Sequence, residues 1–290
     1  MIVSTQTHFL ADTYGLEASI EMLADAGFEG LDLSMFSLST PIFGDDYKAY
    51  AEKIRAIADR RGVKFVQAHA PFGGGYEKYM ADKVPLLPRA MEFSAMLGIS
   101  NIVIHPIQKG IYYGNEKTLF DMNVEFYRSL APYAKKYGIK IAIENMWQRH
   151  PVTKHICDDV LADPKELAAM YDALNDPEAF TVCLDLGHVA LCQREPDDAI
   201  RTIGSRIGCL HIHDVDYIDD LHTLPGVGKI KWNKVCDALA EIGYKGCYNL
   251  EADNFFRGDI LPEHHAMAAK YMYDSSRVFA NRIEAALAAK

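Results

Sequence analysis

The chain has 290 residues, of which 49% are hydrophobic, and it carries a formal net charge of −10 with a pI near 5.5. This balance disfavours a general attraction to nucleic acid or to an anionic membrane, and it suits a small neutral substrate. No apolar run approaches the roughly 20 residues that span a bilayer, and the start, MIVSTQTHFL, lacks the layout of a signal peptide, so we expect a soluble, cytoplasmic protein.

Eight short runs rich in Val, Ile, Leu, Phe and Cys predict β-strands. In chain order they cover residues 2–5, 30–33, 64–68, 101–104, 140–143, 181–184, 208–212 and 247–250. Most of these runs are continuously apolar rather than alternating, which is typical of parallel strands covered on both faces.

Amphipathic segments with helical spacing lie between the strands. Leu16, Ile20 and Leu23 form one apolar stripe, and a second stripe runs from Tyr50 until Gly62 ends it. Further helices are expected near 82–97, 116–137, 164–174, 195–203, 232–242 and 262–289. Strands that alternate with helices in this way predict an α/β fold, a single (β/α)8 TIM barrel domain covering 1–290. An open doubly wound sheet would need a Gly-rich phosphate turn after the first strand, and QTHFLADTYG is not one.

Two other features bear on the fold. The six cysteines are scattered without a C-x-x-C pair, so buried free thiols are expected rather than disulfides or a zinc knuckle. The glycines at 73–75 predict either a flexible loop beside the mouth of the active site expected in such a barrel, or a simple turn in solvent.

Nearly every predicted strand ends in a titratable residue. In chain order these residues are His8, Asp32, His69, His105, Glu144, Asp185, His211 and Glu251. In a barrel, the carboxyl ends of the strands carry the chemistry. Gathering so many polar groups around one axis is costly unless they have partners, and a divalent cation would supply the missing counter-charge.

The loop after the seventh strand adds more metal-capable side chains. Asp220 and His222 precede a Pro-Gly-x-Gly turn, and His188 shares a tight turn with Asp185. Mixed imidazole and carboxylate ligands suit Zn²⁺, Mn²⁺, Fe²⁺ or Co²⁺ better than Ca²⁺. His213 and Asp214 are interpreted as groups that orient His211 by hydrogen bonding. The nearby aromatic residues predict either a floor for a sugar or base, or ordinary loop packing: Phe72, Tyr112, Tyr113 and Trp147.

The ordered short motifs are HAP (69–71), IHP (104–106), IEN (143–145), DLGH (185–188), HIHD (211–214), DLHTLPGVG (220–228) and LEAD (250–253). This series resembles the xylose-isomerase-like barrel superfamily, in particular the sugar phosphate isomerase/epimerase family. The superfamily includes ketose 3-epimerases, inosose-processing enzymes and the endonuclease IV group. The motifs are individually short and collectively specific, and they extend over nearly the whole chain.

The ketose 3-epimerases hold a divalent metal through Glu, Asp, His and Glu, which match Glu144, Asp185, His211 and Glu251. The resemblance therefore implies one divalent ion (Mn²⁺, Co²⁺, Mg²⁺ or Zn²⁺) at these residues. It also implies that Glu144 and Glu251 act as the acid/base pair and that His188 contacts the substrate. We further expect a small sugar substrate, a homo-oligomer, no membrane or nucleic-acid partner, and additional substrate contacts from His69, His105, His222 and Trp147.

The chain departs from the epimerases at two positions. Those enzymes carry an arginine six residues after the metal histidine and a second glutamate six after the first metal glutamate, where this chain has Tyr217 and His150.

The expected reaction is isomerisation or epimerisation of a ketose or related polyol-ketone, in which one carboxylate removes a proton, a metal-stabilised enediolate forms, and the second carboxylate returns a proton. An inosose-type dehydratase could use the same metal site.

The second resemblance predicts a different reaction. Endonuclease IV binds three zinc ions through nine residues, and matching residue types stand here at His69, His105, Glu144, Asp185, His188, His211, Asp220, His222 and Glu251. This alternative is a zinc-dependent phosphodiesterase acting on abasic DNA. The acidic charge and the lack of an Arg/Lys-rich loop with aromatic residues argue against it and favour sugar chemistry.

Overall fold

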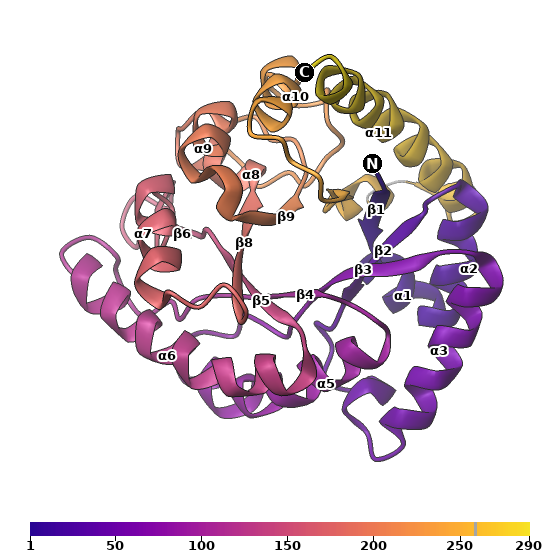
Figure 1. Cartoon of the computed structure of the whole chain (residues 1–290), viewed down its shortest axis with the longest axis horizontal. Coiled ribbons are helices and arrows are strands. Elements are labelled where there is room, and N and C mark those ends of the chain that lie inside the picture. Colours follow the sequence, from indigo (N-terminus) through magenta and orange to yellow (C-terminus); the bar gives the residue numbers. More distant parts are fainter. Residues whose placement is uncertain (258–259) are drawn as a thin grey trace.

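The computed structural model describes residues 1–257 and 260–290. Its central sheet has eight parallel strands in the order β10-β1-β2-β3-β4-β5-β8-β9. They are β1 (Val3–Gln6), β2 (Gly30–Ser34), β3 (Lys64–His69), β4 (Asn101–Ile104), β5 (Lys140–Glu144), β8 (Phe180–Asp185), β9 (Ile207–His211) and β10 (Tyr248–Leu250). The strands line the middle of the molecule and helices surround them (Figure 1). The predicted (β/α)8 barrel is confirmed.

The barrel closes between its last two strands at the end that carries the polar residues. Ile212, just beyond β9, pairs with Leu250 of β10 in a single parallel bridge. The Ile212 N–H donates to the Asn249 carbonyl oxygen at 2.9 Å, and the Glu251 N–H donates to the Ile212 carbonyl oxygen at 2.9 Å. This closure sets His211 beside Glu251.

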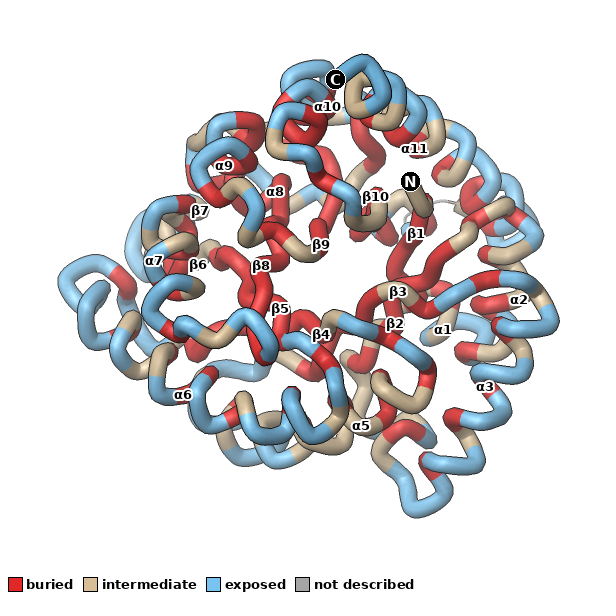
Figure 2. The backbone as a smooth tube through the Cα atoms, in the orientation of Figure 1, coloured by how far each residue is buried: buried red, intermediate tan, exposed pale blue. Residues whose placement is uncertain are grey.

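The outer layer consists of amphipathic helices. Residues at the centre of the molecule are buried, and many on the outside of the helices are exposed (Figure 2). The longer helices are α2 (Leu16–Ala26), α3 (Tyr47–Arg61), α5 (Leu87–Met96), α6 (Glu116–Tyr137), α7 (Pro164–Leu174), α9 (Pro196–Ile203), α10 (Trp232–Glu241) and α11 (His265–Ala288). As expected, α3 and α6 end at glycines with positive φ, Gly62 at 69° and Gly138 at 65°. No helix within the described ranges is long and apolar enough to cross a membrane.

The structure differs from the predicted elements in five places. Short helices α1 (His8–Tyr14) and α8 (Leu186–Leu191) follow β1 and β8 directly, and an antiparallel hairpin, β6 (Trp147–Arg149) with β7 (Ile156–Asp158), follows β5. The helix predicted over 82–97 is present from Leu87 as α5, but short turns from α4 (Tyr76–Lys78) to Leu86 stand in place of its first part, because Pro85 and Pro88 lack the N–H groups that a continuous helix would use. The C-terminal helix begins at His265, after the 3₁₀ turn Pro262–His264.

Candidate metal centre and active site

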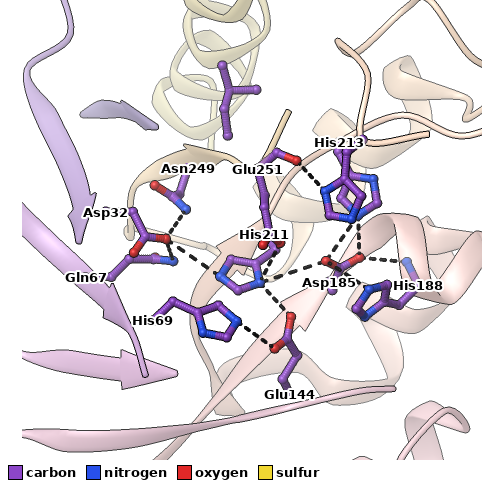
Figure 3. Close-up of polar contacts among 12 residues, drawn as sticks. Asp32, Gln67, His69, Glu144, Asp185, His188, His211, His213, Asn249 and Glu251 are labelled. Carbon is purple, nitrogen blue, oxygen red and sulfur yellow. Dashed lines mark hydrogen bonds and ion pairs between the residues drawn. The ribbon is translucent and has the colours of Figure 1, made fainter. Parts of the chain in front are cut away.

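Four side chains from neighbouring strands converge at the carboxyl end of the barrel (Figure 3). Glu144, Asp185 and His211 are the last residues of β5, β8 and β9, and Glu251 directly follows β10. One potential ligand atom from each lies within 4.8 Å of the others. His211 Nδ1 is 2.6 Å from Glu144 Oε1, 3.0 Å from Glu251 Oε2 and 3.9 Å from Asp185 Oδ2. The strand ends thus bring together the four residues that the sequence predicted as metal ligands.

The charge of this group fits a divalent cation. Its three carboxylates are buried, and their charged neighbours within the described part of the chain are histidines rather than lysine or arginine. Burial opposes ionisation of Glu144, yet His211 and His105 hold its pKa well below the ordinary value. Buried carboxylates require a counter-charge, and a mixed carboxylate and imidazole set suits Mn²⁺, Co²⁺ or Zn²⁺. The residues present therefore fit such an ion.

Two histidines extend this group towards β3 and β4. His105 Nε2 lies 3.0 Å from Glu144 Oε2 and 3.0 Å from His69 Nε2, and His69 Nε2 lies 3.7 Å from Glu144 Oε2. The His69 Nδ1–H donates to the Ala70 carbonyl oxygen at 2.9 Å, which directs Nε2 into the site. Burial lowers the pKa of His105 despite the nearby Glu144, so its neutral ring can accept a hydrogen bond or bind a metal.

A further cluster lies on the other side of Asp185, and one potential ligand atom from each of its four members lies within 4.8 Å of the others. We call it the histidine cluster, and its members are His188, His213, Asp220 and His222. The rings of His213 and His222 stack with centroids 4.0 Å apart. His213 Nε2 lies 3.0 Å from Asp185 Oδ1, so the cluster adjoins the four-residue group.

Charge pairing within the histidine cluster is strong. Burial would lower the pKa of His222, but the hydrogen bond and charge of Asp220, helped by Glu251 and Asp185, raise it to about 10. Burial likewise opposes ionisation of Asp220, and His222 lowers its pKa to about 2. His222 also adopts a positive φ of 41°, a conformation that side-chain-bearing residues rarely hold without surrounding support.

The glycine of the DLGH motif has a steric role in this cluster. A Cβ atom on Gly187 would lie 2.0 Å from Cε1 of His213. Only glycine therefore allows the His213 ring to pack against α8 while it reaches Asp185.

His213 and Asp214 do not orient His211, contrary to the sequence interpretation. His213 reaches Asp185, and Asp214 accepts hydrogen bonds from its own loop. The group behind His211 is Asp32, whose Oδ2 lies 3.7 Å from His211 Nε2. The same oxygen accepts hydrogen bonds from the side-chain amides of Gln67 at 2.7 Å and Asn249 at 2.9 Å. These two amides were missed, although each interrupts an otherwise apolar strand, which is a readable signal in the sequence.

The remaining predicted residues lie at the edge of the site. Trp147, in the β6–β7 hairpin, is half-buried and meets the His188 ring edge-on with centroids 6.3 Å apart. His8 belongs to α1 rather than to a strand end, and its Nδ1 lies 2.9 Å from Asp253 Oδ2. His8 therefore stands outside the candidate metal centre.

The comparisons with known proteins agree with this architecture. The family model described as "Xylose isomerase-like TIM barrel" matches residues 20–271. The D-psicose 3-epimerase of Ruminiclostridium cellulolyticum is 23% identical over 244 residues, covering 80% of this chain and 76% of that protein. Among solved structures, a D-tagatose 3-epimerase-like protein superposes with a TM-score of 0.73 at 20% identity, over 98% of this chain and 100% of the other. The 3-keto-D-glucoside 4-epimerase of E. coli superposes with a TM-score of 0.70 at 17% identity, over 96% and 99% of the two chains. The chain therefore belongs to the xylose isomerase-like TIM barrel family.

Proposed function

We propose that this protein is a divalent-metal-dependent sugar isomerase or epimerase that transfers a proton at the carbon beside the carbonyl of a ketose or related polyol-ketone. The observation that carries the proposal is the convergence of Glu144 and Glu251 on His211, at 2.6 Å and 3.0 Å from the same ring nitrogen. Two carboxylates at one centre supply both the base and the acid that such a transfer needs. The 3-epimerase relative, named for D-psicose, supports a ketose as the substrate class.

Glu144, Asp185, His211 and Glu251 would hold the ion. A divalent cation at this position supplies positive charge beside the substrate carbonyl and so acidifies the neighbouring C–H bond. Glu144 is ionised at neutral pH because His211 and His105 hold its pKa low, so its carboxylate is ready to act as a base. Glu251, in its protonated form, would return a proton, and exchange with solvent would then restore the starting protonation of both glutamates. Return to the same carbon from the other face gives an epimer, whereas return to the neighbouring carbon gives an isomer.

The histidines around the carboxylates are proposed to orient the sugar. His69 and His105 lie on one side of Glu144, while His188 and His222 lie beyond Asp185. The backbone carbonyls of Asn145 and Glu251 accept hydrogen bonds from Nδ1 of His188 and His222, both at 2.8 Å. The Nε2 atom of His188 lies 3.8 Å from Asp185 Oδ2, beyond hydrogen-bond distance, and would meet a substrate hydroxyl, with Trp147 as an apolar wall next to it. The Nε2 atom of His222 pairs with the Asp220 carboxylate at 3.2 Å, so these two side chains would meet the substrate as a pair.

Replacing Glu251 by Gln tests the proposal. The variant keeps the shape and an oxygen ligand but removes the carboxyl group that carries the returned proton, so product formation should fall about 100-fold or more while metal is retained. Deuterium incorporation from solvent into a ketose panel, measured at saturating Mn²⁺, reports the transfer directly. Asp185→Asn is the matched comparison, because excess metal should restore part of its activity. If Glu251→Gln both exchanged deuterium and formed product at the wild-type rate, the two-carboxylate mechanism would be refuted.

A zinc-dependent phosphodiesterase is the second candidate, and the histidine cluster is the observation that favours it. Three groups of potential ligands lie side by side: His69 with Glu144 and His211, the four-residue group, and the histidine cluster. Metal analysis separates the two functions, since one ion supports sugar chemistry and three zinc ions support phosphodiester cleavage. If the protein is a sugar isomerase or epimerase, His222→Ala should lower turnover without loss of metal. If it is a zinc-dependent phosphodiesterase, His222→Ala should lower the metal content of the protein.

A further inference from the structure

The backbone ladder between β5 and β8 ends before it reaches the candidate ligand Asp185. Its pairs run from Ile141 with Phe180 to Glu144 with Cys183. The chain then leaves the sheet, because the Met146 N–H donates to the Val160 carbonyl oxygen at 3.2 Å instead. Asp185 is fully buried, so its backbone N–H and C=O groups need partners that water cannot supply.

The side chain of Asn145 supplies both partners. The Asp185 N–H donates to Asn145 Oδ1 at 2.9 Å, and Asn145 Nδ2–H donates to the Asp185 carbonyl oxygen at 3.0 Å. A side-chain amide carries the same donor and acceptor as a peptide group, so Asn145 continues the ladder by one step. The backbone of Asp185 is thereby tied to the residue that directly follows Glu144.

The carboxylate of Asp185 has a fixed orientation relative to this backbone. Asp185 caps α8, and its Oδ1 accepts the His188 N–H at 2.6 Å and lies 3.0 Å from His213 Nε2. Its Oδ2 lies 3.9 Å from His211 Nδ1, in the four-residue ligand group. A shift of the Asp185 backbone would therefore move Oδ2 relative to Glu144 and His211.

The backbone of Asn145 has a second partner in the site. Its carbonyl oxygen accepts the Nδ1–H of His188 at 2.8 Å. Figure 3 shows the Asp185 carboxylate between His211 and this His188 ring. Asn145 thus contacts one candidate metal ligand through its side chain and one proposed substrate contact through its main chain.

We propose that Asn145 is a positioning residue of the candidate metal centre. Its side-chain amide sets the distance between Glu144 and Asp185, and so the affinity for the ion, while its carbonyl directs the His188 ring towards the substrate. The part that concerns His188 rests on the proposed function, because it assumes that a sugar binds there. The part that concerns the ion does not depend on the substrate.

Replacing Asn145 by Leu tests the inference, because the variant keeps the approximate size of the side chain and removes both hydrogen bonds. Titration of the metal-free full chain should show an affinity for Mn²⁺ that is roughly 10- to 100-fold weaker than in the wild type. Co²⁺ is the second probe, and its visible absorption spectrum should change because the ligand geometry changes. Asn145→Ala, which leaves room for a water molecule, gives the same test if Asn145→Leu does not fold. A wild-type Mn²⁺ affinity in the folded variant would overturn the inference.

Asn123 of α6 provides a matched control. It is buried and makes the same pair of hydrogen bonds to one residue, since the Ile107 N–H donates to its Oδ1 at 2.6 Å and its Nδ2–H donates to the Ile107 carbonyl oxygen at 3.0 Å. Ile107 is not a candidate ligand. Asn123→Leu should therefore unfold at a lower urea concentration, as Asn145→Leu does, but keep the wild-type Mn²⁺ affinity and Co²⁺ spectrum. Equal losses of Mn²⁺ affinity in the two variants would mean general loosening of the barrel and would also overturn the inference.

The two proposals fail in different ways, because the metal titrations need no sugar. A wild-type protein that exchanges no deuterium into any sugar, yet binds Mn²⁺ in a manner that depends on Asn145, refutes the proposed function and retains the positioning role. A wild-type protein that turns over a ketose and binds Mn²⁺ independently of Asn145 does the reverse. With a ketose that is turned over, Asn145→Leu at saturating Mn²⁺ should also show a raised KM, and an unchanged KM would overturn the part that concerns His188.

Discussion

At the scale of single residues, the carboxylate of Asp32 lies behind His211, on the side away from the candidate metal ligands (Figure 3). His211 Nε2 has no hydrogen-bond partner among the described residues, and Asp32 Oδ2 is 3.7 Å away. At this distance the carboxylate forms no hydrogen bond, but its negative charge favours the ring form with the proton on Nε2 and so leaves Nδ1 as the ligand atom. Asp32→Asn should therefore weaken Mn²⁺ binding roughly 10- to 100-fold, measured by titrating the metal-free protein.

The control for Asp32 is Asp45→Asn, a change of the same kind on an exposed loop, which should leave the Mn²⁺ affinity unaltered. Thermal unfolding of the metal-free proteins shows whether Asp32→Asn has merely loosened the barrel. An unchanged Mn²⁺ affinity in Asp32→Asn would mean that Asp32 does not position His211.

At the scale of elements, hydrogen bonds to the Asp214 carboxylate fix the conformation of the loop that carries Asp220 and His222. Its carboxylate accepts hydrogen bonds from the backbone N–H groups of Val215, Gly226 and Ile230 and from the Trp232 indole, over 2.7–3.0 Å. A Cβ on Gly228 would lie 2.4 Å from the same carboxylate, which explains the second glycine of the Pro-Gly-x-Gly turn.

Asp214→Ala leaves these donors without an acceptor in a buried place. An unpaired buried donor costs about 1–3 kcal/mol, so the free energy of unfolding should fall by roughly 3 kcal/mol or more, as measured by urea denaturation. Asp216→Ala is the comparison within the same loop, because its carboxylate accepts from Ile218 and Asp219 at the surface and should matter far less. Equal losses for the two variants would contradict this account of the loop.

At the scale of the whole molecule, the last helix, α11, packs against the first strand, β1, and its neighbours. The Glu29 carboxylate accepts hydrogen bonds from the Arg277 guanidinium of α11 at 2.6 Å, from the Tyr273 hydroxyl at 3.1 Å and from the Val3 N–H at 2.8 Å. One continuous hydrophobic cluster runs from Val3 to Ile283 and includes Met272. The two ends of the described chain therefore share one core.

A chain that ends at residue 264 should fail to fold. Loss of a buried Met or Ile side chain costs about 2–5 kcal/mol, and the total stability of a typical protein is only about 5–15 kcal/mol. Removing α11 discards several such side chains at once, so near-UV circular dichroism should be lost over the whole protein. Deleting only Lys290 is the control. A cooperatively unfolding 1–264 fragment would show that α11 is dispensable and would count against the predicted single domain.

The sequence by itself determined the barrel and the residues at its rim. Continuous apolar runs separated by amphipathic segments are typical of parallel strands under helices, and parallel strands end on the same side. For that reason Glu144, Asp185, His211 and Glu251 could be expected to meet before any coordinate was known. The resemblance of the short motifs then predicted the family.

Only the tertiary structure decided which side chains support the rim residues. Asp32, Gln67 and Asn249 come from three strands, and their contact behind His211 depends on the register of β1, β2, β3 and β10, which local patterns do not encode. His213 turns to Asp185 rather than to His211 because β9 ends at His211 and the chain then bends into a loop.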